Sequence, residues 1–324
     1  MSTHAQVRPI RIAVCPDLLE LDVRTVFGAL ESAGHSVTLL QGSDSEAIVA
    51  EAVDADALML GYGLIDDDAF ARLPALRMVA LASMGFDNVD VEAAHRRGVA
   101  VSNIVGAATE EVALHALALI LDALRGISAH DRAVREGGWG LAAAPLPRRG
   151  SGLTLGIIGL GRIGLALAEM AAPIFGRIIG HDPLPGERTG VEQVPLEVAL
   201  READVISLHL PLTEETTGFL DTGRLGQLRP EAVIVNVSRG GLIDAAALRE
   251  ALDDGRIGAA GLDVLDEEPP PQDHVLVNHP RVTLTPHAAF LSDAALADYV
   301  RLQADNVLTW ARTGRPLTPV PTGS

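Results

Sequence analysis

The chain has 324 residues, of which 48% are hydrophobic and 21% are charged, so a sizeable core is available and global disorder is excluded. Its net charge of −18 would repel a nucleic-acid duplex or an anionic membrane, so neither is expected as a direct partner. The only cysteine, Cys15, excludes an internal disulfide. We therefore expect no cysteine-based metal centre and a reduced, cytoplasmic environment.

The sequence also disfavours a secreted protein and a membrane-spanning protein. Arg8, Pro9, Arg11 and Pro16 interrupt the first apolar run, so the N-terminal stretch lacks the pattern of a signal peptide. The most apolar stretch, 112–124, contains a histidine and an aspartate and is too short to span a bilayer. The length favours two domains, at roughly 100–200 residues each.

The first third of the chain alternates between apolar runs of strand length and helical stretches. Strands are expected at 10–15, 35–40, 55–61 and 76–82, and a helix at 21–34 ends at Gly34. This alternation predicts a parallel sheet covered by helices on both faces.

A longer helix is expected over Thr109–Leu124, with Thr109 as its N-cap and Glu110 and Glu111 in its first turn. Its apolar residues extend nearly all the way around, which is typical of a helix buried between domains or subunits. The Gly- and Pro-rich stretch 136–152 follows and predicts a linker or an extended segment.

A second alternation begins at residue 153. The segment 153–171 reads as strand, turn and helix, and further strands are expected at 176–183, 203–211, 232–238, 257–264 and 281–286. The chain therefore predicts an α/β fold with two doubly wound parallel-sheet domains.

The turn within 153–171 carries the spacing G-x-G-x-x-G at Gly159, Gly161 and Gly164. The first glycine permits a tight turn, the second lets a pyrophosphate approach the backbone, and the third lets helix and strand pack closely. Asp182 follows at the end of the next expected strand, where a carboxylate accepts hydrogen bonds from a ribose; alternatively, Asp182 only forms the turn before Pro183. The complete order of strand, turn, helix, strand and acid predicts dinucleotide binding, with NAD preferred over NADP.

Three later motifs occur in a fixed order: "NVSRGGLID" (236–244), "AGLDVLDEEPP" (260–270) and "TPHAAF" (285–290). Together with "MGFDNVD" (84–90), they make the chain resemble the D-isomer-specific 2-hydroxyacid dehydrogenase family over nearly its whole length. The motifs look closest to the C-terminal-binding-protein branch of that family. The resemblance implies an NAD-binding Rossmann domain, 104–289, inserted into a flavodoxin-like substrate domain made of 1–103 and 290–324.

The resemblance also implies an NAD-dependent oxidoreductase that interconverts a small 2-keto acid and its D-2-hydroxy acid. Arg239 would bind the substrate carboxylate and carbonyl, His287 would act as general acid and base, and Glu268 would orient His287. Each also fits a structural role: a turn arginine, a solvated acid and a packed histidine. Their common position at strand ends favours catalysis, because an open α/β sheet places its ligand crevice there.

The resemblance carries further positions over, with no metal among them. The substrate would contact Ser83, Met84, Gly85, Tyr62 and Phe290. The cofactor would contact Thr109, Gly159, Leu160, Gly161, Arg162, Ile163, Gly164, Asp182, Pro183, His209, Leu210, Pro211, Thr216, Val237, Ser238, Asp263 and Ala289, of which Asp263 would bond the nicotinamide carboxamide. The long helix from Thr109 would contribute to a homodimer interface.

Two alternatives remain open at this stage. One is an NAD(H)-sensing co-regulator of the C-terminal-binding-protein type, which keeps the same three residues. The other is a short form of phosphoglycerate dehydrogenase, because little chain is left for a regulatory domain. Leu81 stands where some relatives with strongly anionic substrates carry an arginine, and the stretch 60–66 lacks basic residues, so we expect an unphosphorylated substrate.

Overall fold

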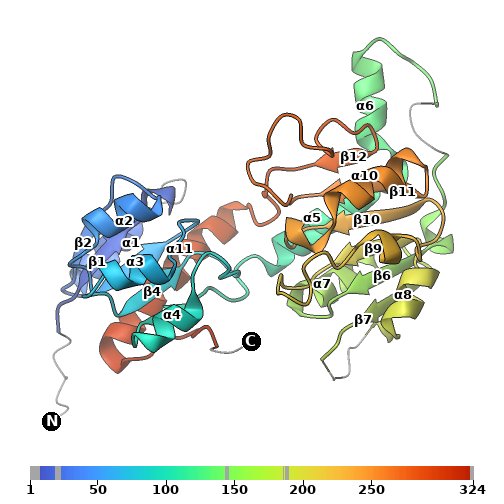
Figure 1. Cartoon of the computed structure of the whole chain (residues 1–324). Coiled ribbons are helices and arrows are strands. Elements are labelled where there is room, and N and C mark those ends of the chain that lie inside the picture. The colour runs from blue at the N-terminus through green and yellow to red at the C-terminus, as the bar shows by residue number, and fades with distance from the viewer. Residues whose placement is uncertain (1–7, 19–22, 143–145, 185, 187–189, 322–324) are drawn as a thin grey trace. The chain divides into compact units, whose positions relative to one another are not determined.

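The computed structural model describes residues 8–18, 23–142, 146–184, 186 and 190–321. It divides the chain into two compact units, 1–107 with 292–324 and 108–291, so the second is inserted into the first (Figure 1). Each unit is built around one parallel sheet, and each is described below by itself.

The first unit contains a five-stranded sheet in the order β2-β1-β3-β4-β5. Its strands are β1 (Arg11–Val14), β2 (Ser36–Leu39), β3 (Ala57–Leu60), β4 (Met78–Leu81) and β5 (Ala100–Ser102). Its helices are α1 (Val23–Ser32), α2 (Ser45–Glu51), α3 (Asp67–Arg72), α4 (Val91–Arg96) and α11 (Asp293–Thr313), with a short 3-10 turn at Pro16–Leu18.

The strands of this sheet are apolar because helices cover both faces. Val300, Val307 and Trp310 of α11 pack with Leu30 of α1 on one face. Residues of α2, α3 and α4 pack on the other face, among them Phe70. Central strands β3 and β4 are therefore buried at every position, as a doubly covered parallel sheet requires.

The second unit contains a seven-stranded sheet in the order β12-β11-β10-β9-β6-β7-β8. Its strands are β6 (Thr154–Ile158), β7 (Arg177–His181), β8 (Glu192–Gln193), β9 (Val205–Leu208), β10 (Ala232–Asn236), β11 (Ile257–Leu262) and β12 (Val282–Leu284). Its helices are α5 (Thr109–Arg125), α6 (Ile127–Arg135), α7 (Arg162–Ala171), α8 (Leu196–Glu202), α9 (Thr222–Leu225) and α10 (Ala245–Asp253), with 3-10 turns at Gly150–Gly152 and Gly240–Leu242.

The strand order of the second unit reverses between β6 and β9. The chain leaves β6 in one direction to β7 and β8, and then returns to the other side at β9. Such a switch point leaves a crevice at the carboxyl ends of the two strands, where ligands of open α/β sheets bind. α8, α9 and α10 share one hydrophobic core with the sheet, while α5 packs on α7, β10 and β11.

The prediction of two doubly wound parallel-sheet units is confirmed, and every expected strand is present. The observed strands are shorter than expected, most clearly β9 and β12, which are about half as long as the predicted runs. Expectation and structure differ at Thr109, which is not the N-cap of α5. Ala108 holds that position and no side chain caps the helix, while the Thr109 hydroxyl is buried without a hydrogen-bond partner. The short elements β5, β8, α6 and α9 were not expected.

No single helix in the described ranges has the length and apolar character needed to cross a bilayer. Only α5 and α6 taken together reach that length, and they are bent by 61° at Gly126. Six residues of α5 are buried inside the protein.

Candidate active site

The glycine motif lies at the switch point of the second unit, between β6 and α7. Gly159 has φ of +97°, a conformation that glycine adopts readily, and a Cβ there would overlap the carbonyl of His209 after β9. A Cβ on Gly164 would overlap the Gly159 carbonyl, so this glycine permits the close approach of helix to strand. A Cβ on Gly161 would meet open space, so here the backbone is accessible to a ligand.

The N-terminus of α7 fits a phosphate group. Its N-cap is Gly161, no side chain caps the helix, and the first helical bond is donated by Leu165 to Gly161. The preceding N–H groups, those of Arg162, Ile163 and Gly164, therefore remain for an anion, which the helix dipole also favours.

Asp182 follows β7 and its carboxylate is held against the glycine motif. Oδ2 accepts from the N–H of Leu160 at 2.7 Å, and Oδ1 accepts from the N–H of Leu184 at 2.8 Å. Each carboxylate oxygen has a second acceptor site, so both ribose hydroxyls of a dinucleotide could still bond there. The open backbone at Gly161, the uncapped helix and the fixed carboxylate together fit NAD.

The segments after β9 and β10 border the same crevice. His209 donates its backbone N–H to Ile158, and its ring bonds the hydroxyl of Ser207 at 2.9 Å, while burial lowers the pKa of the ring to about 4. The imidazole of His209 is therefore neutral at physiological pH. Ser238 donates its hydroxyl to the carbonyl of Leu208 at 2.9 Å, and Thr216 donates its hydroxyl to the carbonyl of Pro211 at 2.7 Å. These bonds hold the loops in place; a contact of their residues with NAD stays a prediction.

His287 and Glu268 form a direct pair in the second unit. Nδ1 of His287 lies 2.7 Å from Oε2 of Glu268, and the other carboxylate oxygen accepts from the N–H of Leu265 at 3.0 Å. Both side chains are about one-third exposed, so the pair is reachable from solvent. Since a carboxylate only accepts, Nδ1 carries the proton and Nε2 is the nitrogen that faces away from Glu268.

The charge of Glu268 is stabilised by its surroundings. Burial raises its pKa, but the hydrogen bond from His287, the charge of His287, the N–H of Leu265 and the charge of Arg239 together lower the pKa below its usual value. Glu268 thus stays ionised through the neutral range and orients the imidazole. Arg239, which follows β10, contributes to the same electrostatic field.

Arg239 is positioned by the loop that follows β10. Its guanidinium donates to the carbonyl of Ser238 at 2.8 Å, and Asn236 donates its amide to the carbonyl of Arg239 at 2.8 Å. The next residue, Gly240, packs directly on the backbone of Leu265, where a Cβ would overlap the peptide. The N–H of Leu265 also donates to Glu268. Gly240 therefore brings the loop that carries Arg239 (the arginine loop) into contact with the loop that carries Glu268 (the glutamate loop). Gly240 and Asn236 are not among the site residues predicted from the sequence, although the paired glycines in "SRGG" were a visible signal.

Asp263, at the end of β11, is almost fully buried, with 1% of its surface exposed. Its carboxylate accepts from Thr285 Oγ1 and from the N–H groups of Ala288 and Ala289. These contacts place Asp263 behind the turn that carries His287. Its expected bond to the nicotinamide carboxamide stays a prediction.

In the first unit, the loop Ser83–Gly85 follows β4. The carbonyls of Ser83 and Met84 accept from Ile104 N and the Asn103 amide, and the Gly85 carbonyl accepts from the Ser83 hydroxyl at 2.6 Å. With the carbonyls bonded to the protein, no hydrogen bond within the described chain uses the N–H groups of these three residues. Adjacent N–H groups of this kind form a site for a carboxylate.

Tyr62 lies in the loop after β3 and is 65% exposed. Its backbone is fixed by Asp17, whose carboxylate accepts from the N–H groups of Tyr62 and Gly63 at 2.7 and 3.1 Å. Asn88 holds the same loop through the carbonyls of Gly61 and Gly63. The strand order of the first unit reverses between β1 and β3, so Asp17 and Tyr62 lie at its switch point. Asp17 and Asn88 were not singled out in the sequence.

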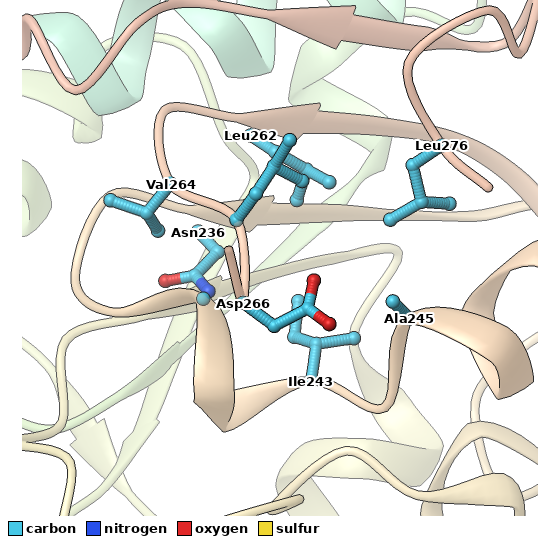
Figure 2. A pocket seen from close by; sticks show the side chains of 9 residues that line it. Asn236, Ile243, Ala245, Leu262, Val264, Asp266 and Leu276 are labelled. Carbon is cyan, nitrogen blue, oxygen red and sulfur yellow. The ribbon is translucent and has the colours of Figure 1, made fainter. Parts of the chain in front are cut away.

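A small pocket lies near the ends of β10 and β11, and Figure 2 shows apolar side chains along most of its wall, with the Asp266 carboxylate among them. The lining residues are Asn236, Gly240, Ile243, Ala245, Leu262, Val264, Leu265, Asp266 and Leu276. None of Arg239, Glu268 and His287 lines it. Among the described residues, no group of three His, Cys, Asp or Glu side chains is placed to hold a metal ion.

Comparison with known proteins also indicates a protein that binds a dinucleotide. Residues 117–289 match the model of the D-isomer specific 2-hydroxyacid dehydrogenase NAD binding domain. A glyoxylate reductase of Korarchaeum cryptofilum is 42% identical over 277 residues, which cover 83% of each chain. A D-3-phosphoglycerate dehydrogenase of Mycobacterium tuberculosis is 39% identical over 263 residues, which cover 78% of this chain but only 48% of the relative.

Solved structures extend the likeness to the whole chain. The crystal structure of an NADPH-dependent glyoxylate/hydroxypyruvate reductase from Sinorhizobium meliloti, in complex with NADP and malonate, has a TM-score of 0.83. The two proteins are 34% identical, and the match covers 97% of each chain.

The fold and the comparisons define an oxidoreductase that binds a nicotinamide dinucleotide. The chain belongs to the D-isomer-specific 2-hydroxyacid dehydrogenase family, and NAD is the cofactor of that family's binding domain. The resemblance to the C-terminal-binding-protein branch stays a prediction.

Proposed function

We propose that this enzyme reduces a small, unphosphorylated 2-keto acid to its D-2-hydroxy acid with NADH, and that Arg239, Glu268 and His287 carry out the reaction. The observation that supports this best is the 2.7 Å contact between His287 Nδ1 and Glu268 Oε2, within the electrostatic field of Arg239. The family assignment supports the reaction class.

Reduction of a 2-keto acid adds a hydride to carbon 2 and a proton to the carbonyl oxygen. Bound NADH supplies the hydride. The guanidinium of Arg239 binds the substrate carboxylate and polarises the carbonyl, since its planar fork matches a carboxylate. His287 donates the proton from Nε2, and Glu268 keeps the imidazole oriented and favours its protonated form. We further propose that the N–H groups of Ser83, Met84 and Gly85 bind the carboxylate, and that Tyr62 and Phe290 contact the substrate side chain.

The proposed substrate carries no phosphate because the two stretches expected to border it supply no cation. The stretches 60–66 and 81–88 contain no Lys or Arg. The guanidinium of Arg148 donates to Asp204 at 2.8 Å, and that carboxylate is only 3% exposed, so Arg148 is already paired within the second unit. A buried phosphate without a cation is costly to desolvate.

We therefore expect kcat/KM for hydroxypyruvate to exceed that for 3-phosphohydroxypyruvate by at least about tenfold, or about 1.4 kcal/mol. The measurement is steady-state oxidation of NADH with both compounds, with glyoxylate and pyruvate as further small substrates. A preference for the phosphorylated compound would contradict the assignment and would make Arg149 the next residue to mutate.

The cofactor preference is a second expectation. Asp182 is held by Leu160 and Leu184, so a 2′-phosphate at the ribose would meet a fixed negative charge. Arg188, the next arginine along the chain, lies outside the described residues. We expect NADH to bind at least about tenfold more tightly than NADPH, because like charges in contact repel.

The measurement is the Kd of both cofactors by fluorescence titration. Asp182→Ala should narrow the difference in Kd between the two cofactors. Asp182→Asn should narrow it as well, since asparagine keeps the side-chain shape and removes the charge, although it can accept only one of the two N–H bonds from Leu160 and Leu184. If the wild type bound both cofactors equally, or if Asp182→Asn left a tenfold preference, Asp182 would not be the discriminating residue.

We also propose that the enzyme is a homodimer. Trp139, Leu141 and Leu146, in the segment that follows α6, are each more than 90% exposed. α6 adds the half-exposed Ile127 and Val134. Exposed apolar side chains so close in the sequence favour a second protein surface, and a second copy of the chain is the partner we propose.

Light scattering coupled to size-exclusion chromatography should therefore give the mass of two chains for the wild type. Trp139→Glu should shift the mass toward one chain, because an ionised carboxylate at a buried apolar contact is unfavourable. The control is Leu317→Glu, which changes an exposed leucine of the other unit. A wild-type monomer, or a Trp139→Glu dimer as stable as the control, would refute the proposed interface.

A further inference from the structure

A buried carboxylate lies directly behind the turn that carries His287. Oδ1 of Asp263 accepts from Thr285 Oγ1 at 2.5 Å and from the N–H of Ala288 at 2.9 Å, and Oδ2 accepts from the N–H of Ala289 at 2.9 Å. The backbone carbonyl of Asp263 accepts from the N–H of His287 at 2.8 Å. A single residue therefore bonds four positions between 285 and 289.

The turn needs this support because of its backbone conformation. His287 has φ of +52°, in the left-handed region that residues with a Cβ seldom adopt. Such a conformation persists only where surrounding contacts hold it. Here the contacts come from Asp263, so the direction of the His287 side chain depends on the position of that carboxylate.

Asp263 is in turn connected to helix α5. Nε2 of His115 lies 2.9 Å from Thr285 Oγ1 and 3.6 Å from Asp263 Oδ1. The carboxylate can only accept, so the hydroxyl of Thr285 donates its one proton to Asp263 and must accept from His115. The direction of both bonds is thereby fixed: His115 donates to Thr285, and Thr285 donates to Asp263.

A second bond joins β12 to the same helix without reaching Asp263. Thr283 of β12, two residues before Thr285, donates to Asp122 of α5 at 2.6 Å. Asp122 also accepts from the N–H of Ser128 at 2.7 Å. Thr283 and Thr285 thus make comparable contacts with α5, but only Thr285 is in contact with the carboxylate behind His287.

We propose that Thr285 and His115 are positioning residues for the reaction: through Asp263 they hold the turn that aims His287 at the substrate. The proposal rests on the role of His287 given above. Loss of the Thr285 hydroxyl removes one of the three donors to the buried carboxylate of Asp263. Only the N–H groups of Ala288 and Ala289 then remain to hold that carboxylate in place. A small displacement of a proton donor lowers the rate of proton transfer more than it lowers cofactor binding.

The test compares the isosteric variants Thr285→Val and Thr283→Val. Thr285→Val should lower kcat for keto-acid reduction by about tenfold or more, while the Kd for NADH, measured by fluorescence, stays within about twofold of the wild type. Thr285→Ser, which keeps the hydroxyl, should restore kcat to within about threefold of the wild type. Thr283→Val should lower Tm by about as much as Thr285→Val does, but it should leave kcat within about twofold of the wild type.

Variants of His115 make the test independent of how well Thr285→Val folds. His115→Leu should lower kcat in the same way, His115→Gln should retain much of it, and the double variant His115→Leu with Thr285→Val should be no worse than the more damaged single variant. Equal kcat for Thr285→Val and Thr283→Val would overturn the proposal, and so would an effect confined to the Kd for NADH. His287→Asn is measured alongside: if it alone kept wild-type kcat, the proposed function would fail, whereas a large loss there with none in Thr285→Val would reject only the positioning role.

Discussion

His287→Asn should lower kcat for keto-acid reduction by about 10²–10⁴, the usual contribution of a general acid, while NADH binds as in the wild type. The imidazole Nδ1 bonds Glu268 at 2.7 Å, so Nε2 is left to deliver the proton. Asparagine keeps a hydrogen-bonding group near Glu268 but has no proton to give at neutral pH. Stopped-flow measurement of NADH oxidation, together with fluorescence titration of NADH, separates the two effects.

Glu268→Gln is the companion variant and should have a smaller effect. The hydrogen bond from His287 and the charges of His287 and Arg239 hold the pKa of Glu268 below its usual value despite its burial, so the wild-type carboxylate is charged throughout the neutral range. Glutamine removes the negative charge that favours protonated His287. Reduction, which needs that proton, should then decline at a lower pH than in the wild type. If His287→Asn kept a kcat close to that of the wild type, His287 would have a structural role and would not be the proton donor.

Gly240→Ala should lower both the stability and kcat of the enzyme, the latter nearly as much as His287→Asn does, although Gly240 takes no part in the chemistry. A Cβ at this position would overlap the backbone of Leu265, which cannot rotate away as a side chain can. The arginine and glutamate loops would have to separate. We expect a loss of about 3 kcal/mol in the free energy of unfolding, from overpacking, and a fall in Tm of about 6–12 °C. A shift of about 1 Å between Arg239 and Glu268 should lower kcat by about 10².

The neighbouring glycine provides a matched control. A Cβ on Gly241 would lie 3.1 Å from Cδ2 of Leu212, the flexible end of a side chain. Gly241→Ala should therefore change both Tm and kcat much less. Calorimetry and steady-state kinetics on the two variants decide the matter: equal behaviour of the two would show that the contact between Gly240 and Leu265 does not position the site.

The parts of the site that could be predicted from sequence are those with a local signal. Gly159, Gly161 and Gly164 occur within six residues and follow an apolar strand, so their role could be inferred from spacing and context. The same holds for Asp182, at the end of the next strand. Long apolar runs likewise predicted the buried strands of both sheets, because a doubly covered parallel sheet leaves few polar positions.

The parts that could not be predicted depend on contacts between distant residues. The bond from His115 to Thr285 joins positions 170 residues apart, and the packing of Gly240 on Leu265 depends on how two loops meet. Strand β5 has only three residues, too few for a clear period. At Thr109 the residue type favoured an N-cap, but the structure begins the helix one residue earlier and buries the hydroxyl.

We propose that this chain turns over a small 2-keto acid rather than only sensing NADH. The most direct measurement titrates the purified protein with NADH by fluorescence and then follows NADH oxidation with glyoxylate, hydroxypyruvate and pyruvate, with chiral analysis of the hydroxypyruvate product. We predict tight NADH binding, one NADH consumed for each 2-hydroxy acid formed, the D isomer as the product of hydroxypyruvate, and loss of turnover in His287→Asn. Tight NADH binding with no turnover of any of these acids would contradict the proposed enzymatic activity and would favour a co-regulator.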